Sequence, residues 1–159
     1  MEITIREATI DDAAALGEIL RSVDWFTSLM ELPAEELQAS VQRALEQCLA
    51  DDSHLVLVAE TGTGLLVGYL SMHWLPYLFL EGAEGYVSEL FVHKAMRSAG
   101  IGTMLLDRAR DEGRAHGCAR LMLVNGRTRE SYQREFYKKK GWRERETMAN
   151  FVYDLKEEK

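Results

Sequence analysis

Hydrophobic and polar positions change their spacing repeatedly along the chain, and each spacing predicts an element. Alternating or continuous short apolar runs predict strands, whereas apolar residues three and four positions apart predict helices. Strands are expected over residues 2–7, 55–60, 65–74, 86–92, 119–124, 142–146 and 150–155. Helices are expected over residues 9–23, 33–50, 101–117 and 129–140. The order βααβββαβαββ predicts an α/β protein whose sheet has mixed strand directions.

Composition narrows the class of protein. A chain of 159 residues with 47% hydrophobic and 28% charged residues is expected to fold as one globular domain. The formal net charge of -7 disfavours binding to nucleic acid, which requires an excess of lysine and arginine. A cationic or neutral substrate fits this charge better.

Cysteine and histidine spacing gives no metal or disulfide signature. Cys48 and Cys118 lie far apart, and the four histidines form no HxxxH or HxH pair. We therefore expect two reduced thiols and no metal. The N-terminus does not resemble a signal peptide, and no apolar run is long enough to span a membrane. A soluble, cytoplasmic protein that binds no membrane is predicted.

The stretch Tyr86–Gly117 predicts a strand, a glycine turn and a helix. Such a junction directs free backbone N–H groups and the positive end of a helix dipole at one point, which favours a phosphate. The turn lacks the GxxxxGK[ST] pattern of a P-loop. A dinucleotide-binding fingerprint would need a third glycine at position 105, which is Leu105.

The same stretch resembles the GCN5-related N-acetyltransferase (GNAT) superfamily. The family pattern Arg/Gln-x-x-Gly-x-Gly/Ala is matched by residues 97–102, and the preceding Leu-x-Val by residues 90–92. Phe136, Tyr137 and residues 140–142 are similar to the family's Phe/Leu-Tyr-x-x-x-Gly-Phe signature. The resemblance covers nearly the whole chain. It implies a mostly antiparallel sheet with two central strands splayed apart, and an activity that transfers acetyl from acetyl-CoA to a primary amine.

The resemblance also implies which residues bind acetyl-CoA. Backbone amides of the glycine turn would hold the pyrophosphate, Arg97 would add a charged contact, and the central strand would pair with the pantetheine arm. Relatives often carry Asn and Ala where this chain has Glu130 and Gln133, so Asn125 or Ser131 is expected to replace the asparagine. The expected acetyl-CoA contacts are Leu90, Phe91, Val92, Arg97, Ser98, Ala99, Gly100, Ile101, Gly102, Thr103, Asn125 and Ser131.

Two side chains are candidates for proton transfer. Glu89 lies in an otherwise apolar strand, where we expect it to share a face with Val87 and Phe91, and burial would raise the pKa of its carboxyl group. It is the expected general base, acting directly or through water; the alternative is a structural pairing with arginine or a solvent-facing edge. Tyr137 matches the family's general acid, whereas Tyr132 is a weaker competitor; the alternative for Tyr137 is a packing role.

The sequence does not identify the amine acceptor. In the family, the loops 24–32 and 75–84 would wall the acceptor pocket, and their aromatic and acidic residues suit a cation. A polyamine, an aminoglycoside or a lysine side chain would fit equally well. Expected acceptor contacts are Trp25, Phe26, Trp74, Tyr77 and Glu81.

Two other functions are compatible with the sequence. A non-catalytic acyl-CoA-binding sensor could share the fold, although it need not keep both Glu89 and Tyr137. An interaction module is supported only by the apolar residues 76–80 and by Trp25 and Phe26. A homodimer is compatible with all three functions.

Overall fold

The computed structural model describes residues 1–156 and divides the chain into two compact units. The first unit spans Met1–Leu123, and the second begins at Val124.

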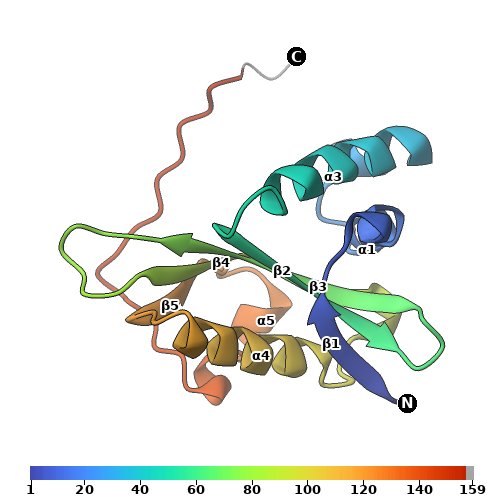
Figure 1. The fold of residues 1–159 in the computed structure, drawn as a ribbon. Helices are drawn as coiled ribbons and strands as arrows, with labels where there is room; N and C mark the ends of the chain where they lie inside the picture. The colour runs from blue at the N-terminus through green and yellow to red at the C-terminus, as the bar shows by residue number, and fades with distance from the viewer. Residues whose placement is uncertain (157–159) are drawn as a thin grey trace. The chain divides into compact units, whose positions relative to one another are not determined.

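The first unit is built on one five-stranded sheet (Figure 1). Its strands lie in chain order, with antiparallel pairing throughout β1–β4 and parallel pairing between β4 and β5. The strands are β1 (Ile3–Glu7), β2 (His54–Thr61), β3 (Leu66–Leu75), β4 (Glu84–Val92) and β5 (Arg120–Leu123). The predicted mixed, mostly antiparallel sheet is confirmed.

Helices cover both faces of this sheet (Figure 1). Helices α1 (Ala13–Ser22) and α3 (Ala34–Cys48) cover one face, and α4 (Ile101–Ala115) covers the other. Three short elements were not predicted as separate pieces: η1 (Ile10–Asp12), α2 (Thr27–Met30) and η2 (Lys94–Met96). Thr9 and Asp12 form a capping box at the predicted helix start, where the Asp12 carboxylate accepts a hydrogen bond from the Thr9 amide.

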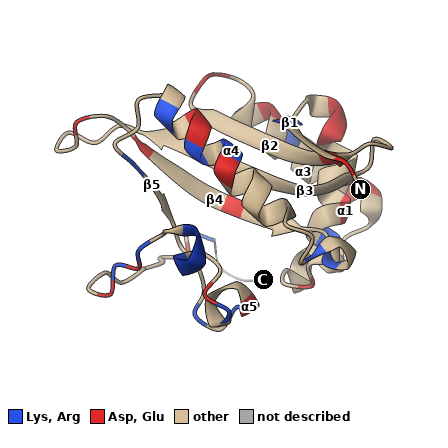
Figure 2. Cartoon of the chain, turned by 90° about the horizontal axis from the view of Figure 1, so that it is seen from below, with Lys and Arg blue, Asp and Glu red and all other residues tan. Residues whose placement is uncertain are grey.

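Each helical layer buries its own apolar surface against the sheet. Leu105, Leu106 and Ala109 of α4 are almost fully buried, whereas arginine and acidic residues on its outer face pair three or four positions apart (Figure 2). On the opposite face, α1 and α3 pack on β2 and β3 around Leu16, Ile19 and Leu45. The sheet is thus enclosed by one apolar layer on each face.

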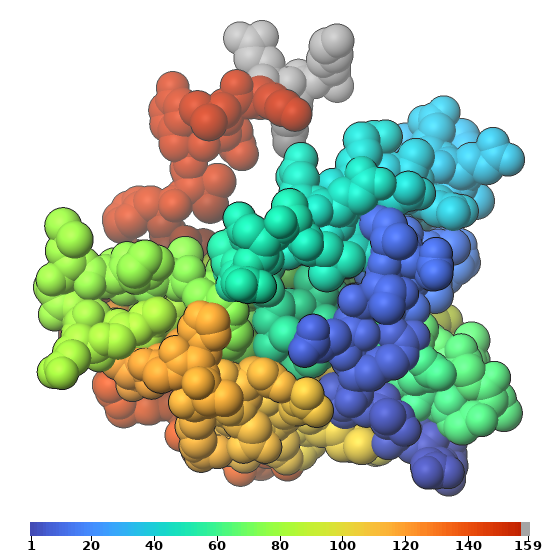
Figure 3. Space-filling model, viewed as in Figure 1, coloured from blue at the N-terminus to red at the C-terminus, as the bar shows by residue number. Residues whose placement is uncertain are grey.

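The β3–β4 connection stands out from the surface (Figure 3). Leu78 and Phe79 at its tip are strongly exposed, the latter by 76%. At its base, the buried carboxylate of Glu84 pairs with Arg120 and accepts a hydrogen bond from the Tyr77 hydroxyl. These buried contacts tie the foot of the loop to β5.

The second unit differs from the sequence prediction in two places. The expected helix over residues 129–140 is two short pieces, α5 (Glu130–Gln133) and η3 (Lys138–Lys140), because Glu135 adopts a left-handed backbone with φ of 54°. The strands expected over residues 142–146 and 150–155 are not formed in the described part of the chain. Alternation predicts an extended backbone, but a strand also requires a partner ladder, and residues 142–156 have none in this structure.

Candidate functional site

A β-bulge in β4 places the candidate base Glu89 and Val87 on different faces of the sheet. Ser71 of β3 is opposite Glu89, but the next residue, Met72, is opposite Val87, so Ser88 is an extra residue in β4. A bulge reverses the alternation of side chains beyond it. Glu89 and Phe91 therefore face α1 and α3, whereas Val87 faces α4. The expectation that Val87 shares a face with Glu89 was wrong, because alternation alone cannot reveal the bulge.

Glu89 is a largely buried carboxyl group with a single hydrogen-bond partner among the described residues. The Tyr69 hydroxyl donates to Glu89 Oε1 at 3.2 Å. Burial raises the pKa of Glu89, and the hydrogen bond from Tyr69 opposes that rise. Among residues 1–156, no arginine pairs with Glu89. A carboxyl group in this environment can accept a proton near neutral pH more readily than an exposed glutamate.

Aromatic rings gather on the same face, around Phe91. The ring centroids of Trp25 and Phe26 lie 5.4 and 5.7 Å from that of Phe91, both edge to face, and the Tyr69 ring lies 5.7 Å away. Such pairs add to the stabilisation that burial provides. Two predicted acceptor contacts, Trp25 and Phe26, are thus brought to the face that carries Glu89.

The loop that carries Trp25 and Phe26 is anchored to the end of β4. Lys94 forms an ion pair with Asp24, and the Lys94 amide donates to the Ser22 hydroxyl at 3.3 Å. Asp24 itself has a φ of 57°, which turns the chain sharply after α1. These contacts hold the segment that carries Trp25 and Phe26 against the end of β4.

The other predicted acceptor contacts lie elsewhere. Trp74 stacks on His116 with ring centroids 4.1 Å apart, on the face that α4 covers. Tyr77 donates its hydroxyl to Glu84 at 3.1 Å, and Glu81 is exposed in the β3–β4 loop. The structure does not bring these three residues together with Glu89, because Trp74 occupies an alternate position of β3 and the others lie beyond the strand end.

The predicted phosphate turn has the backbone of an anion cradle. Ser98 and Gly100 have φ of 67° and 79°, and residues 97–100 are exposed. The first hydrogen bond of α4 runs from the Met104 amide to the Gly100 carbonyl, so the amides of residues 101–103 precede the helical ladder. Consecutive amides of this kind at a helix N-terminus can bind a phosphate group.

The predicted splay lies immediately before this turn. Strand β5 pairs with residues 84–87 of β4 and ends at Leu123. Within the described sheet, residues 88–92 therefore have no strand partner on the β5 side. Leu90, Phe91 and Val92 lie in this unpaired half, whose backbone groups can hydrogen-bond an extended ligand.

In the second unit, Asn125 and Ser131 form a local pair. The Ser131 hydroxyl donates to Asn125 Oδ1 at 3.0 Å. Asn125 Nδ2 is buried and has no hydrogen-bond partner in the described part of the chain. A buried amide donor without a partner is unfavourable.

The two tyrosines of this unit have different environments. The Tyr132 hydroxyl donates to both carboxylate oxygens of Glu144, at 3.1 and 3.2 Å. Tyr137 packs against Phe136 and Trp142, with ring centroids 5.0 and 6.1 Å away, and its hydroxyl makes no hydrogen bond with any described residue. Burial raises the pKa of Tyr137 to about 12, so its hydroxyl stays protonated at neutral pH.

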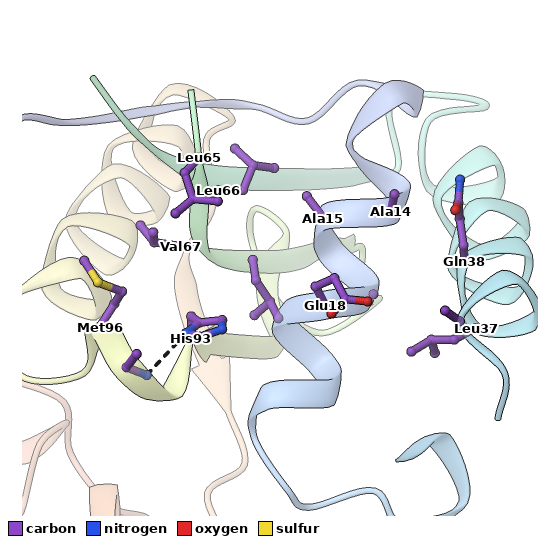
Figure 4. Close-up of a pocket in the computed structure, with 14 residues that line it drawn as sticks. Ala14, Ala15, Glu18, Leu37, Gln38, Leu65, Leu66, Val67, His93 and Met96 are labelled. Carbon is purple, nitrogen blue, oxygen red and sulfur yellow. Dashed lines mark hydrogen bonds between the residues drawn. The ribbon is translucent and has the colours of Figure 1, made fainter. Parts of the chain in front are cut away.

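A separate pocket of about 460 Å³ opens between α1, α3 and the start of β3 (Figure 4). Its wall is mainly aliphatic, with Glu18 and His93 as its ionisable members. His93 accepts a hydrogen bond from the Ala95 amide through Nδ1, at 3.2 Å. None of the predicted acid–base residues lines this pocket.

The described residues contain neither a metal-binding cluster nor a helix that could span a membrane. No cluster of three or more histidine, cysteine or acidic side chains could hold a metal ion there. Within the same residues, no helix combines the length and hydrophobicity that a membrane span needs. Cys48 and Cys118 are free and half-buried.

Residues 20–142 match a family model described as Acetyltransferase (GNAT) family. A comparison with curated proteins finds no match to the sequence. Among solved structures, a transcriptional regulator from Bacillus halodurans C-125 is 26% identical, with a TM-score of 0.83 over 96% of this chain and 100% of that one.

Two acetyltransferases have the same fold at lower identity. Glucosamine-6-phosphate N-acetyltransferase from Arabidopsis thaliana is 19% identical, with a TM-score of 0.74 over 97% of this chain and 100% of that one. An aminoglycoside acetyltransferase from an uncultured soil metagenomic sample is also 19% identical, with a TM-score of 0.73 over 97% of each chain. At this identity, the likeness concerns the fold alone.

Proposed function

Because the chain belongs to the acetyltransferase (GNAT) family, we propose that it is an N-acetyltransferase that uses acetyl-CoA to acetylate a primary amine. The amine is carried by a small molecule or by a lysine or peptide. The observation that carries the proposal is Glu89, a partly buried carboxyl group in the part of β4 that has no β5 partner and leads into the anion-binding turn.

Acetyl-CoA supplies the acetyl group as a reactive thioester. The backbone amides of residues 98–103 hold its pyrophosphate, and Arg97 adds a charge-assisted contact. The free backbone of residues 90–92 pairs with its pantetheine arm. Asn125 Nδ2, a buried donor without a partner in the described residues, offers one further hydrogen bond, next to Ser131.

Glu89 acts as the general base. An alkylammonium group has a pKa near about 10, so it must lose a proton before its nitrogen can attack. Burial raises the pKa of Glu89, so its carboxylate is a stronger base and accepts a proton from the amine more readily. The proton moves from the amine nitrogen to a Glu89 oxygen, directly or through one water.

Tyr137 acts as the general acid. Its hydroxyl remains protonated at neutral pH and makes no hydrogen bond with any described residue, so it is available to donate. Tyr132 is the weaker candidate, because its hydroxyl is already donated to Glu144. The thiolate that leaves when the C–S bond breaks takes the Tyr137 proton.

The surroundings of Glu89 favour an amine whose substituent is apolar, such as an alkyl or aryl group. An aromatic surface lies on the same face as Glu89. It consists of Phe91, two residues further along β4, and of Trp25 and Phe26, which pack on Phe91. Such a surface favours apolar contacts and cation–π interactions with the ammonium group. A phosphorylated acceptor would need a free cation here, but Lys94 is already paired with Asp24.

The alternative is a non-catalytic acyl-CoA-binding domain on the same fold. The observation that favours it is the 26% identity to the transcriptional regulator from Bacillus halodurans C-125. A thiol-release assay with acetyl-CoA and a panel of amines separates the two functions. We expect coenzyme A release that depends on both substrates; binding of acetyl-CoA without turnover on any amine would favour the sensor.

A further inference from the structure

Tyr69 is a residue that the sequence patterns did not single out. It lies in the middle of β3, directly opposite Phe91 in the antiparallel ladder. Its side chain belongs to the core that α1 and α3 form with the sheet, and only 4% of the residue is exposed. Its position is therefore fixed by packing, independently of any ligand.

The hydroxyl of this buried ring reaches the candidate base. It donates to Glu89 Oε1 at 3.2 Å, whereas no described residue hydrogen-bonds Glu89 Oε2. The contact is diagonal across the two strands, because Tyr69 lies opposite Phe91 and Glu89 is two residues before Phe91 on the same face.

We propose that Tyr69 is a positioning residue for amine activation, whose hydroxyl fixes one oxygen of the Glu89 carboxylate and leaves the other to accept the proton of the amine. This inference rests on the proposed function, because Glu89 must be the base for its orientation to affect catalysis. Buried side chains that orient a reacting group reduce the reorganisation required when the proton moves.

The hydrogen bond also limits how far burial can raise the pKa of Glu89. A hydroxyl that donates to a carboxylate stabilises its ionised form and lowers its pKa, which opposes the effect of burial. Tyr69 stays neutral, because burial and the adjacent Glu89 charge raise its own pKa. Other titratable groups near this face include the Cys48 thiol of α3 and, further along the sheet, His54, His73 and Tyr86.

A purely structural role would give a different outcome on mutation. If Tyr69 only fills space beside Phe91, phenylalanine can replace it without changing how Glu89 titrates. If Tyr69 positions the carboxylate, loss of the hydroxyl raises the pKa of Glu89 by about one unit, since one hydrogen bond to the charged form is lost.

The experiment is a titration of Glu89 by ¹³C NMR of glutamate-labelled protein, without substrates. The Glu89 signal is assigned by its absence in Glu89→Gln. Tyr69→Phe is compared with Tyr86→Phe, a control on β4 whose hydroxyl has no hydrogen bond to Glu89. We expect the Glu89 pKa to rise in Tyr69→Phe only, and the acid limb of kcat/KM to move to higher pH by the same amount.

Three outcomes separate the inference from the proposed function. An unchanged Glu89 pKa in folded Tyr69→Phe overturns the positioning role. A raised pKa in a protein that acetylates no amine supports the hydrogen bond to Glu89 but refutes the proposed function. If Tyr69→Phe fails to fold, 3-fluorotyrosine at position 69, a stronger donor, must lower the Glu89 pKa; no change there also overturns the inference.

Discussion

At the scale of single residues, the ionised form of Glu89 is disfavoured by burial, yet this carboxyl group is the proposed general base. Its side chain lies in an apolar layer and is supported by one hydrogen bond, from Tyr69. Because its pKa is raised in the folded protein, the folded state holds a proton more tightly than the unfolded chain. Stability associated with Glu89 is therefore lost as pH rises through the window between its unfolded and folded pKa values.

Glu89→Gln is expected to stabilise the protein at neutral pH while it removes activity. Glutamine keeps an oxygen that accepts from Tyr69 but places no charge in the apolar layer, so Tm should rise by a few degrees, for a gain on the order of 1 kcal/mol. The gain should vanish below about pH 4, where the native carboxyl is protonated in both states. Differential scanning calorimetry across pH tests this; an equal gain at every pH would contradict the assigned burial effect.

Tyr137→Phe is expected to lower kcat on the true acceptor by about 10²-fold, because the protonated hydroxyl that serves the leaving thiolate is lost. The affinity for acetyl-CoA, measured by calorimetry, should be nearly unchanged. Tyr132→Phe is the matched control, since it removes a hydroxyl that donates to Glu144. Unaltered turnover in Tyr137→Phe would remove this residue from the mechanism.

At the scale of elements, the strand–turn–helix from β4 to α4 carries most of the proposed chemistry. Its turn has two residues with positive φ, Ser98 and Gly100, and its strand carries Glu89. A Cβ added at Gly100 would meet no atom within 4 Å, so the space above this glycine is open. The turn therefore needs a glycine for backbone conformation and, under the proposed function, for ligand approach.

Gly100→Ala is expected to weaken acetyl-CoA binding by about tenfold, since the added methyl group occupies the approach of the pyrophosphate. Its left-handed backbone also costs roughly 1 kcal/mol of stability. Gly64→Ala is the matched control: Gly64, in the β2–β3 turn, has φ of 84° and equally open space. Both variants should lose similar Tm; equal coenzyme affinity in the two would contradict the role of this turn.

Most elements of the first unit could be predicted from periodicity. The strands β1–β5 and the helices α1, α3 and α4 lie within a few residues of their expected bounds. The bulge at Ser88 could not be predicted, because an extra residue in a strand leaves no mark in an alternating pattern. Tyr69 was not recognised as the partner of Glu89, because the sequence does not give the register in which β3 pairs with β4. Residues 142–155 alternate as strands do, but alternation does not supply a partner strand.

At the scale of the whole molecule, the candidate site depends on elements far apart in sequence. The α1–α2 loop brings Trp25 and Phe26 to Phe91, and α3 brings Cys48 near Glu89. Trp74 was predicted for the acceptor contacts, but it stacks on His116 on the other face of the sheet. Local sequence could identify the anion-binding turn, whereas the acceptor surface is defined only by the fold.

Acetyl-CoA is expected to stabilise the whole protein against heat. A ligand present at 100 times its Kd adds about 2.7 kcal/mol to the unfolding free energy, which for a chain of this size corresponds to a Tm increase of roughly 5–10 °C. The measurement is thermal unfolding with and without saturating acetyl-CoA. The absence of any shift would contradict acyl-CoA binding and favour an interaction module.

The most direct test of acetyl transfer is the rate of coenzyme A release across a panel of amines, measured for the native protein and for Glu89→Gln. The panel should include an arylalkylamine, an alkylamine, spermidine, an aminoglycoside, glucosamine 6-phosphate and a lysine peptide. We predict that coenzyme A release requires both acetyl-CoA and an amine and is fastest with amines that carry an apolar alkyl or aryl group. This release is lost in Glu89→Gln. No release with any amine, or equal release in Glu89→Gln, would contradict the proposed enzyme.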